Sequence, residues 1–213
     1  MTEVLTACTR DYSGAEVRLS FAGSDELAAQ IRQGVKPDVY AAANTELPDD
    51  LRRRGLLEEP VRFATNELVL AVAKGSDIHS LSDLTRTDTK LAIGSASVPI
   101  GSYTRETLAK LPRGEERAIL ARVRSNEPDV KGIVGKVAQG AADAGFVYVT
   151  DVDAAAGKLR AIGLPAELRP TVVYAAGVVV GAREPERARG FVRGLVSGTC
   201  ARALRPAGFG PPP

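Results

Sequence analysis

Hydrophobic and polar positions follow two alternating periods along the chain. Short apolar runs of strand length are followed by segments in which apolar residues recur at helical spacing. This alternation is typical of an α/β fold with largely parallel sheets. Strands are predicted at 17–21, 38–43, 67–73, 90–94, 123–126, 144–149 and 172–180, and helices at 24–34, 46–54, 102–111, 130–139 and 185–196.

Two of the predicted strands, Glu67–Ala73 and Val172–Val180, are long and apolar. We interpret them as the points where the chain leaves one lobe and returns to it. The first lobe would then contain residues 1–70 and 176–213, and the second lobe residues 71–175. A single continuous sheet is the alternative that periodicity leaves open.

Composition and charge exclude several classes of function. The 28 basic and 26 acidic side chains give a net charge of +2, and no basic run is longer than Arg52–Arg54, so nucleic-acid binding has little support. No apolar run approaches the roughly 20 residues of a membrane span. The segment that begins at Met1 also lacks the basic and hydrophobic regions of a signal peptide.

Signatures of catalysis are missing from the sequence. The only histidine, His79, lies in a polar stretch, and there is no Gly-x-Ser-x-Gly motif, metal-binding pair or phosphate loop. We therefore expect that the protein is not an enzyme. Cys8 and Cys200 have no metal-binding spacing, and they are either two small buried side chains or a disulfide.

Three predicted helices begin with small residues that directly follow a strand. These starts are Phe21–Ser24, Val98–Ser102 and Pro128–Val130. The N-terminus of a helix presents unpaired N–H groups and a partial positive charge, which suits an oxyanion. Each start taken singly is also typical of an ordinary capped helix. Tyr148 ends an apolar strand, where its phenol is either a further donor or a core aromatic group.

In their order, these segments resemble the solute-binding proteins that deliver molybdate or tungstate to ABC importers. The resemblance runs from Met1 to about Gly210 and rests on FAGSDELAAQI, KPDVYAAAN, SVPIGSYTRETL, NEPDVKGIV and AGFVYVTD. It implies a two-lobe fold like that of the type II periplasmic binding proteins, with two crossing hinge strands and a ligand cleft between the lobes.

The resemblance also implies the donors of the site. Ser24 would contribute its hydroxyl and N–H groups, Ile100 and Val130 their backbone N–H groups, and Tyr148 its hydroxyl. The metal would enter only as molybdate or tungstate, and no cofactor is expected. Ile100 is bulkier than the alanine common at its position in this family, so its side chain should point away from the ligand.

One element of the family is expected to be missing. The resemblance implies a strand ending in Ala-Ala-Ser just before a Leu-Thr helix start, and Met1-Thr2 stands at the place of that Leu-Thr. We therefore expect a chain truncated at its N-terminus, without a signal peptide, a first strand and one binding serine. Loss of an interior strand should leave unpaired backbone groups and an apolar slot.

The function that the resemblance implies is an extracytoplasmic, monomeric receptor. It would capture molybdate or tungstate and deliver the oxyanion to an ABC permease. Two alternatives share the fold: a cytosolic oxyanion-sensing domain and a degenerate paralogue that does not bind.

Overall fold

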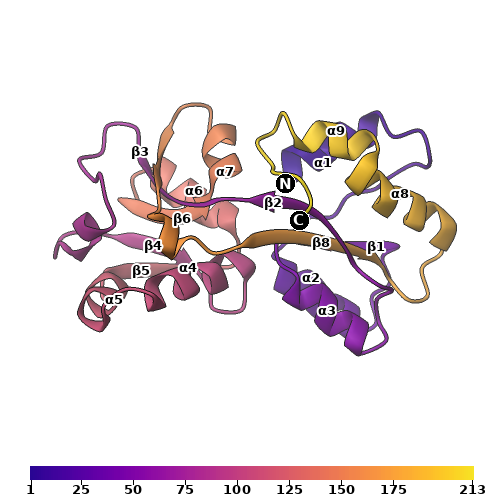
Figure 1. The fold of residues 1–213 in the computed structure, drawn as a ribbon, viewed down its shortest axis with the longest axis horizontal. Helices are drawn as coiled ribbons and strands as arrows, with labels where there is room; N and C mark the ends of the chain where they lie inside the picture. The colour runs from indigo at the N-terminus through magenta and orange to yellow at the C-terminus, as the bar shows by residue number, and fades with distance from the viewer. The chain divides into compact units, whose positions relative to one another are not determined.

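The computed structural model describes all 213 residues, which form two compact units (Figure 1). Unit 1 consists of Met1–Asn66 and Val172–Pro213, and unit 2 consists of Glu67–Thr171. The chain therefore leaves and re-enters unit 1 a few residues before the positions expected from the two long apolar strands.

Unit 1 contains a three-stranded antiparallel sheet with the order β1–β8–β2. Its central strand, β8, buries every side chain. Helices α2 and α3 pack against β1, and α8 packs against β2 and β8 (Figure 1). The elements of the unit are α1 (Thr2–Arg10), α2 (Ser24–Arg32), β1 (Val39–Ala42), α3 (Glu46–Arg53), β2 (Val61–Asn66), β8 (Val172–Val178), α8 (Pro185–Ser197) and α9 (Thr199–Leu204).

Unit 2 contains a five-stranded mixed sheet with the order β5–β4–β6–β3–β7. Strand β4 runs parallel to β5 and β6, whereas β3 runs antiparallel to β6 and β7. The elements of the unit are β3 (Leu68–Ala73), η1 (Ser82–Thr85), β4 (Leu91–Gly94), α4 (Pro99–Ala109), α5 (Arg113–Leu120), β5 (Val123–Glu127), α6 (Val130–Ala138), β6 (Ala144–Tyr148), α7 (Val149–Ala154), β7 (Leu159–Gly163) and η2 (Ala166–Leu168).

The structure confirms most of the predicted elements and adds two strands, β2 and β7, that periodicity missed. The expectation of largely parallel sheets is wrong, because only β4 pairs in parallel, with β5 and β6. The pairing of β2 with β8 shifts register between Arg62 and Ala64. Such an irregularity breaks the two-residue alternation by which strands are recognised. Helix α4 also begins at Pro99 rather than at Ser102, because proline fits the first position of a helix.

The predicted strand at Val17–Phe21 is wrong. These residues belong to no strand of either sheet. Residues 15–22 and 37–41 both line a cavity of about 430 Å³, whose walls also include side chains of α1, α2 and α8 such as Leu5, Ile31 and Phe191. A strand forms only where a neighbouring backbone completes its hydrogen bonds, and no strand pairs with the edge of β1 opposite β8. In unit 1, β1 thus pairs with β8 alone, and residues of β1 form part of the cavity wall.

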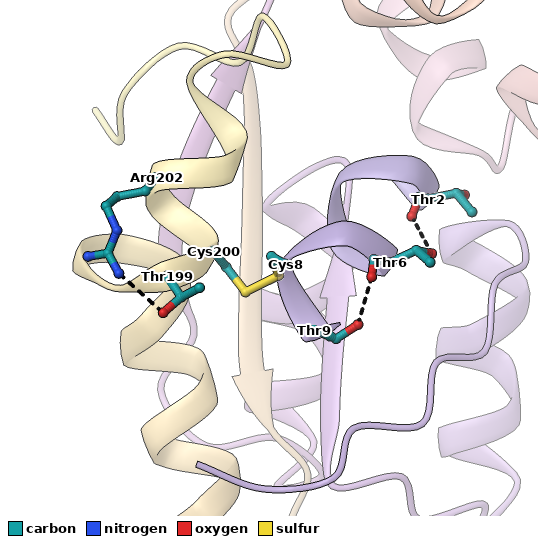
Figure 2. The surroundings of a disulfide bond; sticks show 7 residues. All are labelled: Thr2, Thr6, Cys8, Thr9, Thr199, Cys200 and Arg202. Atoms are coloured by element: carbon teal, nitrogen blue, oxygen red, sulfur yellow. Dashed lines mark hydrogen bonds between the residues drawn. A yellow bond between two sulfur atoms is a disulfide. The ribbon is translucent and has the colours of Figure 1, made fainter. Parts of the chain in front are cut away.

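A disulfide joins Cys8 of α1 to Cys200 of α9 (Figure 2). The two Cα atoms are 4.9 Å apart although the residues are 192 positions apart in sequence. Both cysteines are almost completely buried. Of the two alternatives left open for these residues, the disulfide is the one that the structure contains.

Removal of this disulfide should destabilise the protein markedly. A Cys8→Ser/Cys200→Ser variant is expected to lose about 2–5 kcal/mol of unfolding free energy, because the cross-link closes a long loop and restricts the unfolded chain. Urea unfolding with and without a reducing agent measures the loss. The reductant should shift the midpoint of the wild type and leave that of the variant unchanged. Equal midpoints for oxidised and reduced wild type would contradict this expectation.

Candidate oxyanion-binding site

Three of the four predicted donors lie at one edge of the unit 2 sheet. Ile100 follows β4, Val130 follows β5, and Tyr148 is the last residue of β6. Because β4 runs parallel to both β5 and β6, the carboxyl ends of the three strands meet at the same edge. The chain continues from β4 to β5 on one side and then crosses to β6 on the other, which makes this edge a topological switch point. Ligands of open α/β sheets bind at such points.

The start of α4 lies against the end of β4 because residue 101 is glycine. A Cβ atom at Gly101 would be 1.9 Å from the carbonyl oxygen of Ser95. This glycine therefore allows the helix backbone to approach the strand backbone. The Val98 carbonyl accepts the N–H groups of Gly101 and Ser102, both at 3.0 Å, and Pro99 has no N–H group. The Ile100 amide is therefore the first N–H group of α4, and no backbone carbonyl of the chain accepts it.

The side chain of Ile100 is buried against β4. It is 2% exposed, and a Cβ atom at position 94 would lie 2.6 Å from its Cγ2 atom, so Gly94 provides the space that the isoleucine fills. The bulk of Ile100 is thereby directed into the sheet. At the helix start itself, the residue therefore presents its backbone rather than its side chain.

At the start of α6, Asp129 caps the helix. Its Oδ1 atom accepts the N–H group of Gly132 at 2.9 Å. This bond stabilises the helix, as an acidic N-cap commonly does. The carboxylate is directed to the third residue of the helix, and the Val130 amide has no acceptor within the chain. The capping role therefore accounts for an acidic residue at this helix start.

A second carboxylate, Glu127, ends β5 close to the same helix. It is 9% exposed, and Lys136 pairs with its Oε1 atom at 3.0 Å while the Ser125 hydroxyl donates to the same oxygen. Burial raises the pKa of Glu127, but the hydrogen bonds from Ser125 and Lys136 lower it more, so that the net pKa lies below its ordinary value. The charge of Glu127 is thus balanced locally by Lys136.

Tyr148 is held by the strand and by the helix that follows it. The residue is 3% exposed and pairs with Leu68 of β3. Its backbone N–H donates to Oδ2 of Asp151 at 3.1 Å, across the start of α7. The backbone of Tyr148 is therefore fixed at the carboxyl edge of the sheet.

The fourth predicted donor, Ser24, lies in unit 1 as the first residue of α2. Its Oγ atom accepts the N–H group of Ala43 at 3.3 Å, and its carbonyl oxygen accepts the hydroxyl of Tyr40 at 2.7 Å. Because the bond from Ala43 uses a lone pair of Oγ, the hydroxyl hydrogen of Ser24 remains able to donate. Burial raises the pKa of Tyr40, so the phenol stays protonated and keeps its bond to Ser24.

Sequence reasoning missed two residues that support these helix starts. Tyr40 was assigned only to a buried strand, and its alternation pattern carries no information about a hydroxyl partner. Arg105 lies four residues after Gly101 on α4, where long helical side chains lean back over the first turn. That spacing is a signal that could have identified Arg105.

Loss of the Tyr40 hydroxyl should weaken unit 1 modestly. The Tyr40→Phe variant is expected to lose about 1 kcal/mol of unfolding free energy, because the Ser24 carbonyl loses a partly buried hydrogen bond. Urea unfolding measures this loss. Tyr12→Phe is a matched control, since the ring of Tyr12 packs edge-on against Phe191 and should keep that contact. An equal loss of unfolding free energy in the two variants would show that the hydrogen bond to Ser24 contributes no specific stability.

The cap at Asp129 should be needed for the stability of α6. Asp129→Ala is expected to cost about 1 kcal/mol, whereas Asp129→Asn keeps a capping oxygen and should cost only a few tenths. Thermal unfolding of both variants measures the difference. The capping role is refuted if alanine and asparagine are equally tolerated.

Comparison with known proteins agrees with this architecture. Residues 1–210 match the family of bacterial extracellular solute-binding proteins. The molybdate-binding protein ModA of Mycobacterium tuberculosis is 37% identical over 202 residues, which cover 93% of this chain and 75% of that protein. ModA of Haemophilus influenzae is 29% identical over 228 residues, covering 98% of this chain and 86% of the relative.

Solved structures share the fold at lower sequence identity. The periplasmic molybdate-binding protein of Azotobacter vinelandii superposes with a TM-score of 0.86 at 21% identity, covering 100% of this chain and 96% of that one. The sulfate-binding protein SubI of Mycobacterium tuberculosis gives a TM-score of 0.83 at 16% identity, covering 99% and 82%. The chain therefore belongs to the bacterial extracellular solute-binding proteins and has the α/β fold of the periplasmic binding proteins.

Proposed function

We propose that the protein is a receptor that captures molybdate and delivers it to an ABC permease. The observation that carries this proposal is the pair of amides, at Ile100 and Val130, that the chain leaves without acceptors at one edge of the unit 2 sheet. The names of the similar ModA proteins support the choice of ligand. We also propose Tyr148 and Ser24 as hydroxyl donors to the ligand.

The donor set favours a fully deprotonated tetrahedral dianion. All four proposed donors are neutral N–H or O–H groups, which bind the oxygens of molybdate or tungstate and offer no acceptor for a proton. Hydrogen phosphate would require such an acceptor. Sulfate carries the same charge as molybdate and is smaller, so discrimination against it must come from the spacing of the donors.

Local charge balance also supports an anion at this edge. The Asp129 carboxylate accepts a helix N–H group and that of Glu127 pairs with Lys136, so both negative charges have partners of their own. The partial positive charge at the starts of α4 and α6 then favours an incoming anion.

The cellular location that we propose is extracytoplasmic, as for the family. Disulfides persist in oxidising compartments and are rare in the cytosol, so the buried bond between Cys8 and Cys200 favours this location over a cytosolic sensing domain. No helix has the length and apolar character needed to cross a bilayer. The family consists of transport receptors, and we propose no catalytic activity for this member.

Isothermal titration with molybdate, tungstate and sulfate tests the proposal. The folded protein should bind molybdate and tungstate more tightly than sulfate. Tyr148→Phe and Ser24→Ala should each weaken molybdate binding by about ten- to a hundredfold, because a hydrogen bond to a charged ligand is lost. Tyr12→Phe is the control and should bind like the wild type. A folded protein that binds none of the anions, or that is insensitive to Tyr148→Phe, would contradict the proposal.

A further inference from the structure

One guanidinium connects the three backbone segments that lead to the amide donors of unit 2. The Nη1 atom of Arg105 donates to the carbonyl oxygens of Gly94 at 2.8 Å and Gly101 at 3.0 Å. Its Nη2 atom donates to Oδ1 of Asn126 at 3.3 Å. These acceptors belong to the end of β4, the first turn of α4 and the end of β5.

The same region contains the last hydrogen bond between the two strands. The N–H group of Ser95, one residue beyond β4, donates to the carbonyl oxygen of Glu127 at 2.9 Å. Val130 begins α6 three residues after Glu127, and Ile100 is the neighbour of Gly101. A change in the position of either strand end would therefore move one donor amide relative to the other.

We propose that Arg105 is a positioning residue for oxyanion binding, which fixes the spacing between the amide donors of Ile100 and Val130. This inference rests on the proposed function. It adds a residue that determines how tightly the site binds the anion and how well it distinguishes anions of different size. Arg105 itself donates to protein acceptors, so it acts on the ligand through the two helix starts.

The chemistry of arginine suits this role better than that of lysine. A guanidinium has five N–H donors in a rigid planar fork and remains charged at all relevant pH values. It can therefore serve acceptors on three segments at once while its planar geometry sets the angles between them. A lysine ammonium keeps the charge but is a single point on a flexible stem, so Arg105→Lys separates positioning from charge.

Titration of Arg105→Lys and Arg105→Met with molybdate and sulfate tests this inference. Both variants should bind molybdate on the order of tenfold more weakly, and the ratio of molybdate to sulfate affinity should fall, because the donor spacing is no longer fixed. Arg124→Lys is the matched control, since Arg124 donates only to the carbonyl oxygens of Ala121 and Val123 at the start of β5.

Amide hydrogen exchange provides a readout that does not depend on binding. In both Arg105 variants, the amides of Ser95, Gly101 and Ser102 should exchange faster, while those in the middle of β3 should keep the wild-type rate. Wild-type selectivity in Arg105→Lys would overturn the inference, as would equal loss of both anions together with faster exchange throughout unit 2. If the wild type binds neither anion, the proposed function fails and local exchange alone decides whether Arg105 positions the helix starts.

Discussion

The parallel pairing of β4 with β5 and β6 is the constraint on which the candidate site depends. It brings the starts of α4 and α6 and the end of β6 to one edge of a sheet, although these residues are far apart in sequence. A helix start alone offers only a few N–H groups in one direction. Convergence of several such donors requires a rigid support, and the buried strands of unit 2 supply it.

The close approach of the α4 backbone to the end of β4 places the first donor amide on that support. The absence of side chains at Gly94 and Gly101 lets α4 begin directly on the strand end, with the side chain of Ile100 filling the space between them. Charged side chains then stabilise and connect the helix starts. Asp129 caps α6, Lys136 balances Glu127, and Arg105 bridges β4, α4 and β5. The amides of Ile100 and Val130 have no backbone acceptor in the chain, and we propose them as donors to the ligand.

Local signals made much of this arrangement predictable from the sequence. Pro99, Gly101 and Asp129 mark helix starts through their own backbone and side-chain chemistry, and the apolar runs of β3 and β8 are long enough to be recognised. Signals that depend on distant partners were not available. Val17–Phe21 alternates like a strand but has no neighbouring strand, and the pairing of Cys8 with Cys200 depends on how α1 meets α9.

The partners of polar side chains were hidden for the same reason. Tyr40 bonds to Ser24, and Arg105 bonds to residues of two strands, which only the folded chain brings together.

The central claim concerns the Ile100 and Val130 amides, and an amide NMR titration with molybdate observes them directly. We predict that these two amide proton resonances show the largest shifts of unit 2 and that sulfate shifts them less at equal concentration. Saturable binding that leaves both resonances unchanged would contradict the account.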